Sequence, residues 1–166
     1  PGEPALVEVR LSSGFDRRLA GSSRPVQEWQ AMGVQAQGGG RLPPAGEATL
    51  MFPAGTNGPA LLTFRNFQVI KRYNNADSYS IAIAHLADRL RGAGPFAASW
   101  PRDDRPLTAD EREELQRLLA RSGHYQGEID GRIGSGSLAA VRSWQSANGM
   151  APDGYVSLTL LQRLRR

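Results

Sequence analysis

The sequence contains no cysteine and only two histidines, His85 and His124. The absence of cysteine excludes disulfide bonds, and two histidines are too few for a metal-binding cluster, so we expect neither a metal nor a cofactor. The chain also lacks a signal peptide and any apolar run long enough to cross a membrane. Because it begins at Pro1-Gly2 without a methionine, we interpret it as a mature or truncated piece of a longer protein.

The charge is nearly balanced in spite of a pI near 10.1. Residues 1–100 hold ten basic and seven acidic side chains, residues 101–166 hold ten and nine, and 19 of the 20 cations are arginine. We find no basic stripe interleaved with aromatic residues, so we predict no nucleic-acid binding. The mildly positive net charge would instead suit an anionic polymer other than nucleic acid.

The last third of the chain, residues 107–166, predicts three short helices. Thr108 and Glu111 form a capping box before the first helix, which carries leucines at 115, 118 and 119 and ends at Gly123. The second helix is expected from about Ser135 to Asn148, with positions 138, 141 and 144 or 145 facing inward. The third is expected from about Ser157, with leucines at 158, 161 and 164. Together they predict a three-helix bundle near the lower size limit for an independent core.

An ordered set of turn signals runs through this region. It consists of Leu115-Gln116, Gly123, Tyr125, Gly127, Asp130-Gly131, Gly134, Gln145, Asn148-Gly149 and Asp153-Gly154. This order resembles the peptidoglycan-binding domain appended to many bacterial wall hydrolases. The chain departs from that family where Pro and Thr usually follow the last glycine of the loop, because Ser135 and Ser137 stand there and could cap the helix instead.

The resemblance implies that this domain binds the cell wall, and physical reasoning makes the glycine-rich loop from Gly131 to Ser137 the expected ligand site. A loop of this kind that opens a helix presents free N–H groups to carboxylates or acetamide carbonyls of the wall. Alternatively, each glycine only permits the turn. The candidate wall-binding residues of this domain are Tyr125, Asp130, Gly131, Gly134 and Ser137.

A second informative stretch covers residues 58–92. Its second half predicts a helix with Tyr79, Ile83, Leu86 and Leu90 on one face, capped by Asn74 or Asn75 and ended by Gly92. We expect the segment before it, residues 65–74, to be extended and to turn into that helix.

This stretch resembles the end of the catalytic region in the membrane-bound lytic transglycosylase B family. The matching residues are Asn66, Phe67, Ile70, Arg72, Tyr73, Asn74 and Tyr79. The resemblance implies that Arg72, Tyr73, Asn74 and Tyr79 border a glycan groove, where an aromatic ring can face a sugar and an amide can both donate and accept hydrogen bonds. The alternative is that Tyr73 belongs to the core and Asn74 is a helix cap.

The first 57 residues predict short strands. Residues 5–11 alternate, with Val7, Val9 and Leu11 on one side, and residues 49–52 and 61–64 have strand composition between turns. A short helix is expected from Pro25 to Met32. The small antiparallel sheet that results agrees with the β subdomain of the same transglycosylase family.

No glutamate has the setting of a catalytic acid. The resemblance implies a single carboxylic acid that protonates the leaving oxygen between N-acetylmuramic acid and N-acetylglucosamine and then accepts the C6 hydroxyl proton as a 1,6-anhydro ring closes. Such a group needs an apolar pocket that raises its pKa, and in this family Thr or Ser-x-x-Gly follows it. We find no such glutamate here, and the resemblance places it upstream of Pro1.

The sequence therefore predicts an α+β chain in three parts: a β subdomain with a closing core helix (residues 1–94), a linker (95–106) and a three-helix peptidoglycan-binding domain (107–166). We expect it to bind peptidoglycan, by glycan strand or stem peptide, as the C-terminal portion of a lytic transglycosylase, with the catalytic domain upstream. The expected location is the periplasm or outer membrane of a bacterium. The alternative is a non-catalytic wall-binding protein complete in itself, and in either case this chain alone is expected to be inactive.

Overall fold

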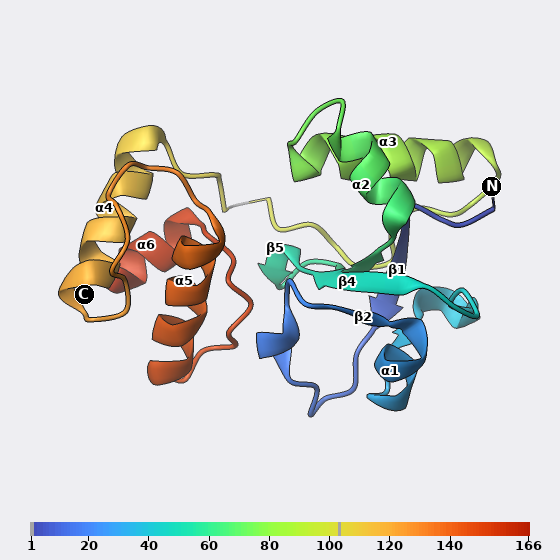
Figure 1. Ribbon diagram of the computed structural model, residues 1–166, viewed down its shortest axis with the longest axis horizontal. Helices are drawn as coiled ribbons and strands as arrows, with labels where there is room; N and C mark the ends of the chain where they lie inside the picture. The colour runs from blue at the N-terminus through green and yellow to red at the C-terminus, as the bar shows by residue number, and fades with distance from the viewer. Residues whose placement is uncertain (1, 103) are drawn as a thin grey trace. The chain divides into compact units, whose positions relative to one another are not determined.

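The computed structural model describes residues 2–102 and 104–166, and the chain divides into two compact units (Figure 1). The N-terminal unit is Pro1–Trp100 and the C-terminal unit is Pro101–Arg166. The first combines a sheet with helices and the second is helical, so the predicted α+β class is confirmed. None of the helices in the described parts of the chain has the length and apolar character needed to cross a bilayer.

An antiparallel five-stranded sheet organises the N-terminal unit, in the order β2-β4-β6-β1-β3. The strands predicted at residues 5–11, 49–52 and 61–64 are confirmed as β1, β4 and β6, and β1 pairs with β6 so that Val7 lies opposite Leu62. The strands are β1 (Leu6–Arg10), β2 (Ser23–Pro25), β3 (Gln35–Ala36), β4 (Glu47–Met51), β5 (Pro53–Thr56) and β6 (Ala60–Thr63), with 3₁₀ turns at Arg17–Leu19 and Gln37–Gly39.

Helix α1 (Val26–Ala31) packs on one face of the sheet. Val9 from β1 and Leu62 from β6 join Trp29 in the core there, with Val7 and Leu11 partly buried beside them. The Trp29 indole is fully buried and its N–H donates to the Ala48 carbonyl at 2.8 Å. The expected alternation of β1 is thus confirmed, because alternate residues of a strand point to one face.

Helices α2 (Arg65–Lys71) and α3 (Asp77–Leu90) cover the other face of the sheet (Figure 1). The buried residues of this layer are Leu6, Leu61, Phe67, Ile81 and Ala84. The expectation that residues 65–74 are extended is wrong, since residues 65–71 form a helix whose Phe67 enters the core. The predicted cap of α3 is also wrong: Ala76 is the N-cap, and Asn74 instead accepts a hydrogen bond from its backbone N–H at 3.0 Å.

The segment after α3 is hydrogen-bonded to strand β1 of the sheet. The Glu8 carboxylate accepts hydrogen bonds from the backbone N–H groups of Ala97 and Ala98, at 2.8 and 2.9 Å. Phe96 stacks on His85 of α3, with ring centroids 4.1 Å apart, and meets Trp100 edge-on. Residues 95–100, which we assigned to the linker, therefore pack with the N-terminal unit.

The C-terminal unit is the predicted bundle of three helices, α4 (Ala109–Arg121), α5 (Ser135–Ala147) and α6 (Leu158–Leu164). The capping box of Thr108 and Glu111 is present, and Ser157 caps α6. Two further predictions fail: Gly134 caps α5 without a side-chain bond, and Leu138 lies outside the buried core. The core consists of Leu107, Leu115, Leu119, Ala140, Val141, Trp144, Leu160 and Leu161.

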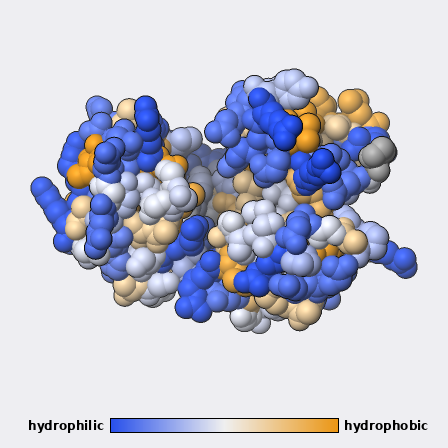
Figure 2. All heavy atoms as spheres, in the orientation of Figure 1, coloured by the Kyte–Doolittle hydropathy of each residue, from blue (hydrophilic) through white to orange (hydrophobic). Residues whose placement is uncertain are grey.

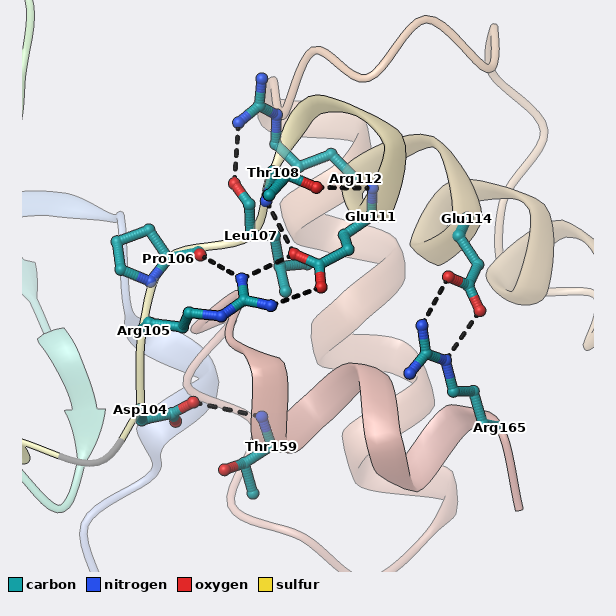
Figure 3. Close-up of polar contacts among 10 residues, drawn as sticks. All are labelled: Asp104, Arg105, Pro106, Leu107, Thr108, Glu111, Arg112, Glu114, Thr159 and Arg165. Carbon is teal, nitrogen blue, oxygen red and sulfur yellow. Dashed lines mark hydrogen bonds and ion pairs between the residues drawn. The ribbon is translucent and has the colours of Figure 1, made fainter.

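The residues that lead into α4 are tied to the bundle (Figure 3). Arg105 makes a bidentate ion pair with Glu111, with N···O distances of 2.7 and 2.6 Å. The Asp104 carboxylate accepts a hydrogen bond from the Thr159 N–H at the start of α6. Of the predicted linker, residues 104–106 thus belong with the C-terminal unit, and position 103 lies outside the described residues.

Candidate functional site

The loop between α4 and α5 is closed by one buried side chain, Gln116 of α4. This amide is completely buried, and its Oε1 accepts hydrogen bonds from the N–H groups of Asp130 and Gly131 at 3.0 and 2.8 Å. Its Nε2 donates to Asp130 Oδ1 at 3.2 Å and to the Arg132 carbonyl at 3.1 Å. A buried amide with both ends engaged fixes the path of the loop. We call this arrangement the Gln116 lock.

The loop between α5 and α6 repeats the arrangement. Gln145 Oε1 accepts from Gly154 N–H at 2.9 Å, and its Nε2 donates to Asp153 Oδ1 at 2.7 Å. In each loop the glycine after the aspartate has positive φ, +68° at Gly131 and +73° at Gly154, a conformation that glycine adopts without steric cost. The two Asp-Gly pairs of the sequence motif are therefore parts of two glutamine locks, which we name after Gln116 and Gln145.

Four of the five wall-binding candidates in this unit lie around the Gln116 lock. Ser137 is buried, with its Oγ 3.3 Å from Gln116 Nε2, and the Tyr125 hydroxyl donates to the Glu128 carbonyl at 2.9 Å. Asp130 accepts a backbone hydrogen bond from Arg132 and a side-chain bond from Gln116, which together lower the pKa of its carboxyl. These side chains thus hold the loop itself, a role that we assigned only to the glycines.

Gly131 and Gly134 occupy different environments. Gly131 is buried, and a Cβ there would lie 3.2 Å from the Ala109 carbonyl oxygen. Gly134 is exposed at the start of α5, with open space where a Cβ would point. Of the two, only Gly134 is accessible to a large ligand.

A hollow of about 460 Å³ lies beside the Gln116 lock, between the start of the α4–α5 loop and one side of α5. Tyr125 is shared by the lock and the hollow. His124 and Ser143 face each other in the lining, with Nδ1 and Oγ 2.9 Å apart. Sequence reasoning missed the hollow, since its lining is mostly glycine and alanine. The lining residues are Gly123, His124, Tyr125, Gln126, Gly127, Gly136, Ala139, Ala140 and Ser143.

The other candidates, Arg72, Tyr73, Asn74 and Tyr79, lie at the turn from α2 to α3 and on the first turn of α3. All four are exposed, Tyr73 to 86%. The alternative that Tyr73 belongs to the core is therefore wrong for the chain as described. An exposed tyrosine ring beside an arginine and an amide has the composition of a carbohydrate-contacting surface.

The apolar face of α3 predicted from the sequence is present but points away from the sheet. Tyr79, Ile83, Leu86 and Leu90 are all exposed, Leu90 to 81%, and the buried side of the helix carries Ser80, Ile81 and Ala84. Figure 2 shows hydrophobic residues reaching the surface among hydrophilic ones. Large exposed apolar residues gathered on one helix are typical of interaction surfaces. We call these four residues the α3 apolar face.

Most of the glutamates are engaged in ion pairs or hydrogen bonds. Glu28, Glu111, Glu113 and Glu114 each pair with an arginine, and Glu8 holds the segment after α3. Hydrogen bonds from Arg105 and Thr108 lower the pKa of Glu111 to about 2, and those from Arg165 lower the pKa of Glu114. A general acid needs the opposite shift. Within the described residues, no cluster of three His, Cys, Asp or Glu could hold a metal ion.

Two family models match the chain, in the order expected. A transglycosylase SLT domain matches residues 1–88, and a peptidoglycan binding domain matches residues 108–164. Protein disulfide isomerase pTAC5, chloroplastic, from Arabidopsis thaliana is 40% identical over 58 residues, which cover 33% of this chain and 15% of that protein.

Crystal structures of SltB3 from Pseudomonas aeruginosa resemble almost the whole chain. The complex with NAG-anhNAM-pentapeptide matches with 45% identity and a TM-score of 0.94, and the complex with NAG-NAM-pentapeptide with 46% and 0.93. Each match covers 99% of this chain and 45% of the SltB3 chain, so the chain spans less than half of that protein's length.

Proposed function

Because the chain belongs to the transglycosylase SLT domain family, we propose that it is the C-terminal portion of a lytic transglycosylase and that it binds peptidoglycan. The observation that carries the proposal is the order of the two matches, a transglycosylase domain followed by a peptidoglycan-binding domain. The likeness to SltB3, solved with peptidoglycan fragments, supports it over 99% of the chain. The pTAC5 name implies disulfide exchange, for which this chain has no cysteine.

The reaction divides between this chain and the part of the enzyme upstream. The catalytic acid protonates the glycosidic oxygen between N-acetylmuramic acid and N-acetylglucosamine, and the C6 hydroxyl then closes the 1,6-anhydro ring. That acid needs an apolar pocket, and the pairing of Glu111 and Glu114 with arginines lowers their pKa instead. We propose that the acid comes from a domain upstream and that Arg72, Tyr73, Asn74 and Tyr79 border the glycan groove.

The α3 apolar face supports a catalytic domain that extends beyond the N-terminal unit. Leaving Leu86 and Leu90 in water is unfavourable, since burying a leucine side chain contributes about 1.5–3 kcal/mol. Cover by an upstream domain of the same protein would account for this face. A lytic transglycosylase acts on the cell wall, so the proposed location is the periplasm or outer membrane of a bacterium.

Incubation with purified sacculi tests the proposal. The chain should sediment with sacculi and should release no 1,6-anhydro muropeptides, whereas the protein extended upstream should release them. Release by the chain alone would contradict our account of the acid, and failure to sediment would contradict peptidoglycan binding. An extended native protein that lacks lytic activity would favour the non-catalytic alternative.

Two variants separate the two candidate surfaces in the same assay. Gly134→Val places a bulky side chain at an exposed loop position with open space around it, and should weaken sedimentation if the α4–α5 loop supplies the affinity. Tyr73→Ala removes the exposed ring at the α2–α3 turn, and should weaken sedimentation if the glycan groove supplies it. If neither variant loses binding while circular dichroism shows intact folding, both site assignments are wrong.

A further inference from the structure

The hollow beside the Gln116 lock has a lining without strong charge. Its walls are backbone and small side chains, with Ala139 and Ala140 from α5 and the Tyr125 ring from the loop. The polar side chains of its lining belong to His124, Gln126 and Ser143 besides Tyr125, and no lysine, arginine, aspartate or glutamate is among the lining residues. The hollow thus suits a small neutral group that combines an apolar part with hydrogen-bonding atoms.

We propose that this hollow binds the 2-acetamido group of an amino sugar in the peptidoglycan glycan strand. The inference rests on the proposed function, since it names the part of the polymer that the C-terminal unit recognises. An acetamido group has a methyl for the alanine surface and an amide that both accepts and donates a hydrogen bond.

The His124 and Ser143 pair matches that amide in either tautomer of the neutral imidazole. If the serine hydroxyl donates to Nδ1, Nε2 carries a proton to donate and Oγ can still accept. If Nδ1 donates to Oγ, the hydroxyl can donate and Nε2 can accept. Each case provides one donor and one acceptor, the complement of an amide N–H and carbonyl.

A free carboxylate from a stem peptide fits the hollow less well. Carboxylate sites in proteins commonly use arginine or lysine, and the lining of the hollow has neither. Arg142, which is next in sequence to Ser143, is not among the lining residues. The absence of charged residues from the lining thus favours the glycan strand over the stem peptide as the ligand.

The loop that forms the hollow is rigidly held, which favours a preformed site. The Tyr125 hydroxyl bonds the Glu128 carbonyl, and the His124 N–H donates to the Leu119 carbonyl at 2.9 Å. Gly127 packs so tightly against the Tyr125 ring that a Cβ there would collide with its hydroxyl. A site fixed before binding avoids the entropy cost of ordering its loop.

NMR titration of the full chain tests the inference with three probes. The first is the tetramer of β-1,4-linked N-acetylglucosamine, and the second is cellotetraose, which carries a hydroxyl in place of each acetamido group. The third is a free stem pentapeptide. The N-acetylated tetramer should shift the amide signals of residues 123–127 and 139–143, and neither of the other probes should do so at equal concentration.

A pair of alanine-to-leucine variants on α5 makes the test specific. Ala139→Leu fills the hollow on an exposed helical position and should weaken tetramer binding at residues 123–143 by roughly tenfold or more, a change of about 1.4 kcal/mol. Ala147→Leu makes the same change at an exposed position of the same helix that does not line the hollow, and should leave the affinity unchanged. Circular dichroism should show both variants folded.

Several results would overturn the inference. They are equal shifts with cellotetraose, shifts of the hollow with the pentapeptide alone, and tetramer binding that Ala139→Leu leaves intact. The absence of any tetramer shift in this loop would overturn it too. Sedimentation of the unmodified chain with sacculi, measured in parallel, distinguishes failure of the acetamido site from failure of the proposed function. Sedimentation without tetramer shifts refutes the acetamido site alone, whereas no sedimentation refutes the proposed function.

Discussion

Gln116, one of the residues of the sequence motif, organises the α4–α5 loop of the C-terminal unit from a buried position. It supplies acceptors to two backbone N–H groups and donors to a carboxylate and a carbonyl, all from a position without solvent contact. A buried polar group in such a network stabilises only if every partner is satisfied. Replacement of the amide by an apolar group therefore leaves the buried Gly131 N–H without its acceptor.

We expect Gln116→Leu to open the loop without unfolding the bundle. A buried N–H that loses its acceptor costs about 1–3 kcal/mol, so hydrogen exchange of Gly131 should accelerate by roughly tenfold or more. The Gly154 amide, held by the Gln145 lock, is an internal control and should keep its protection. Gln162→Leu, at an exposed position of α6, is the matched variant. Unchanged exchange at Gly131 in Gln116→Leu would contradict the lock.

At the scale of the element, the start of α4 depends on the charge of Glu111. The Glu111 carboxylate takes an ion pair from Arg105 and a hydrogen bond from the Thr108 N–H (Figure 3). The Arg105 bonds are the largest cause of the fall of its pKa from 4.5 to about 2. A carboxyl whose pKa is lower in the folded state stabilises that state fully above pH 4.5, and the contribution disappears as the pH falls toward 2.

The stability of the Glu111→Gln variant should depend on pH in the way that the lowered pKa of Glu111 requires. We expect the variant to be less stable than the unmodified chain above pH 4.5, and the difference in unfolding free energy should shrink between pH 4.5 and pH 2. Urea unfolding followed by the NMR signals of α4 measures this difference. Glu128→Gln removes a carboxylate from the exposed loop and should show no such trend. A difference that is constant with pH would contradict the role of the charge.

The helices show what the sequence could and could not predict. The capping box, Ser157 and the leucines of α4 are local signals, and the structure agrees with them. The orientation of α3 could not be predicted, because periodicity finds an apolar face without saying what covers it. The sequence correctly placed the four apolar residues of α3 on one face, but it did not reveal that this face is exposed.

The candidate site was harder to predict than the fold. The motif pointed to the α4–α5 loop, but Asp130 and Ser137 of that loop bond to Gln116, a contact across 14 to 21 positions that spacing does not reveal. Five of the nine residues that line the hollow are glycine or alanine, whose separate positions in the sequence carry no chemical signal. Only the folded loop brings His124 to Ser143.

At the scale of the whole molecule, each end of the connecting segment is hydrogen-bonded to the unit that it adjoins. Glu8 fastens residues 97 and 98 to the sheet, and Asp104 bonds the N–H of Thr159 in the bundle. The predicted linker of residues 95–106 is thus shared between the units. Each unit also has a core of its own, which is the property that defines an independent domain.

A fragment of residues 101–166 should therefore fold and unfold cooperatively by itself. Asp104→Ala in that fragment should lower its unfolding free energy by about 0.5–1 kcal/mol, since it removes a side-chain acceptor at the start of α6. Thermal unfolding by circular dichroism measures both effects. A fragment without a cooperative transition, or with narrow amide dispersion in its NMR spectrum, would contradict the modular arrangement.

The two glutamine locks close loops of different length, with Gln and Asp 14 positions apart in the first and 8 apart in the second. The same closure thus tolerates six additional residues, and the longer loop is the one that includes residues 123–127 beside the hollow. Exposed loop residues between the glutamine and the Asp-Gly pair, such as Gln126, can therefore be exchanged while the closure stays intact, provided that Leu119 and Tyr125 are kept. The bundle is in this sense a scaffold for grafted recognition loops.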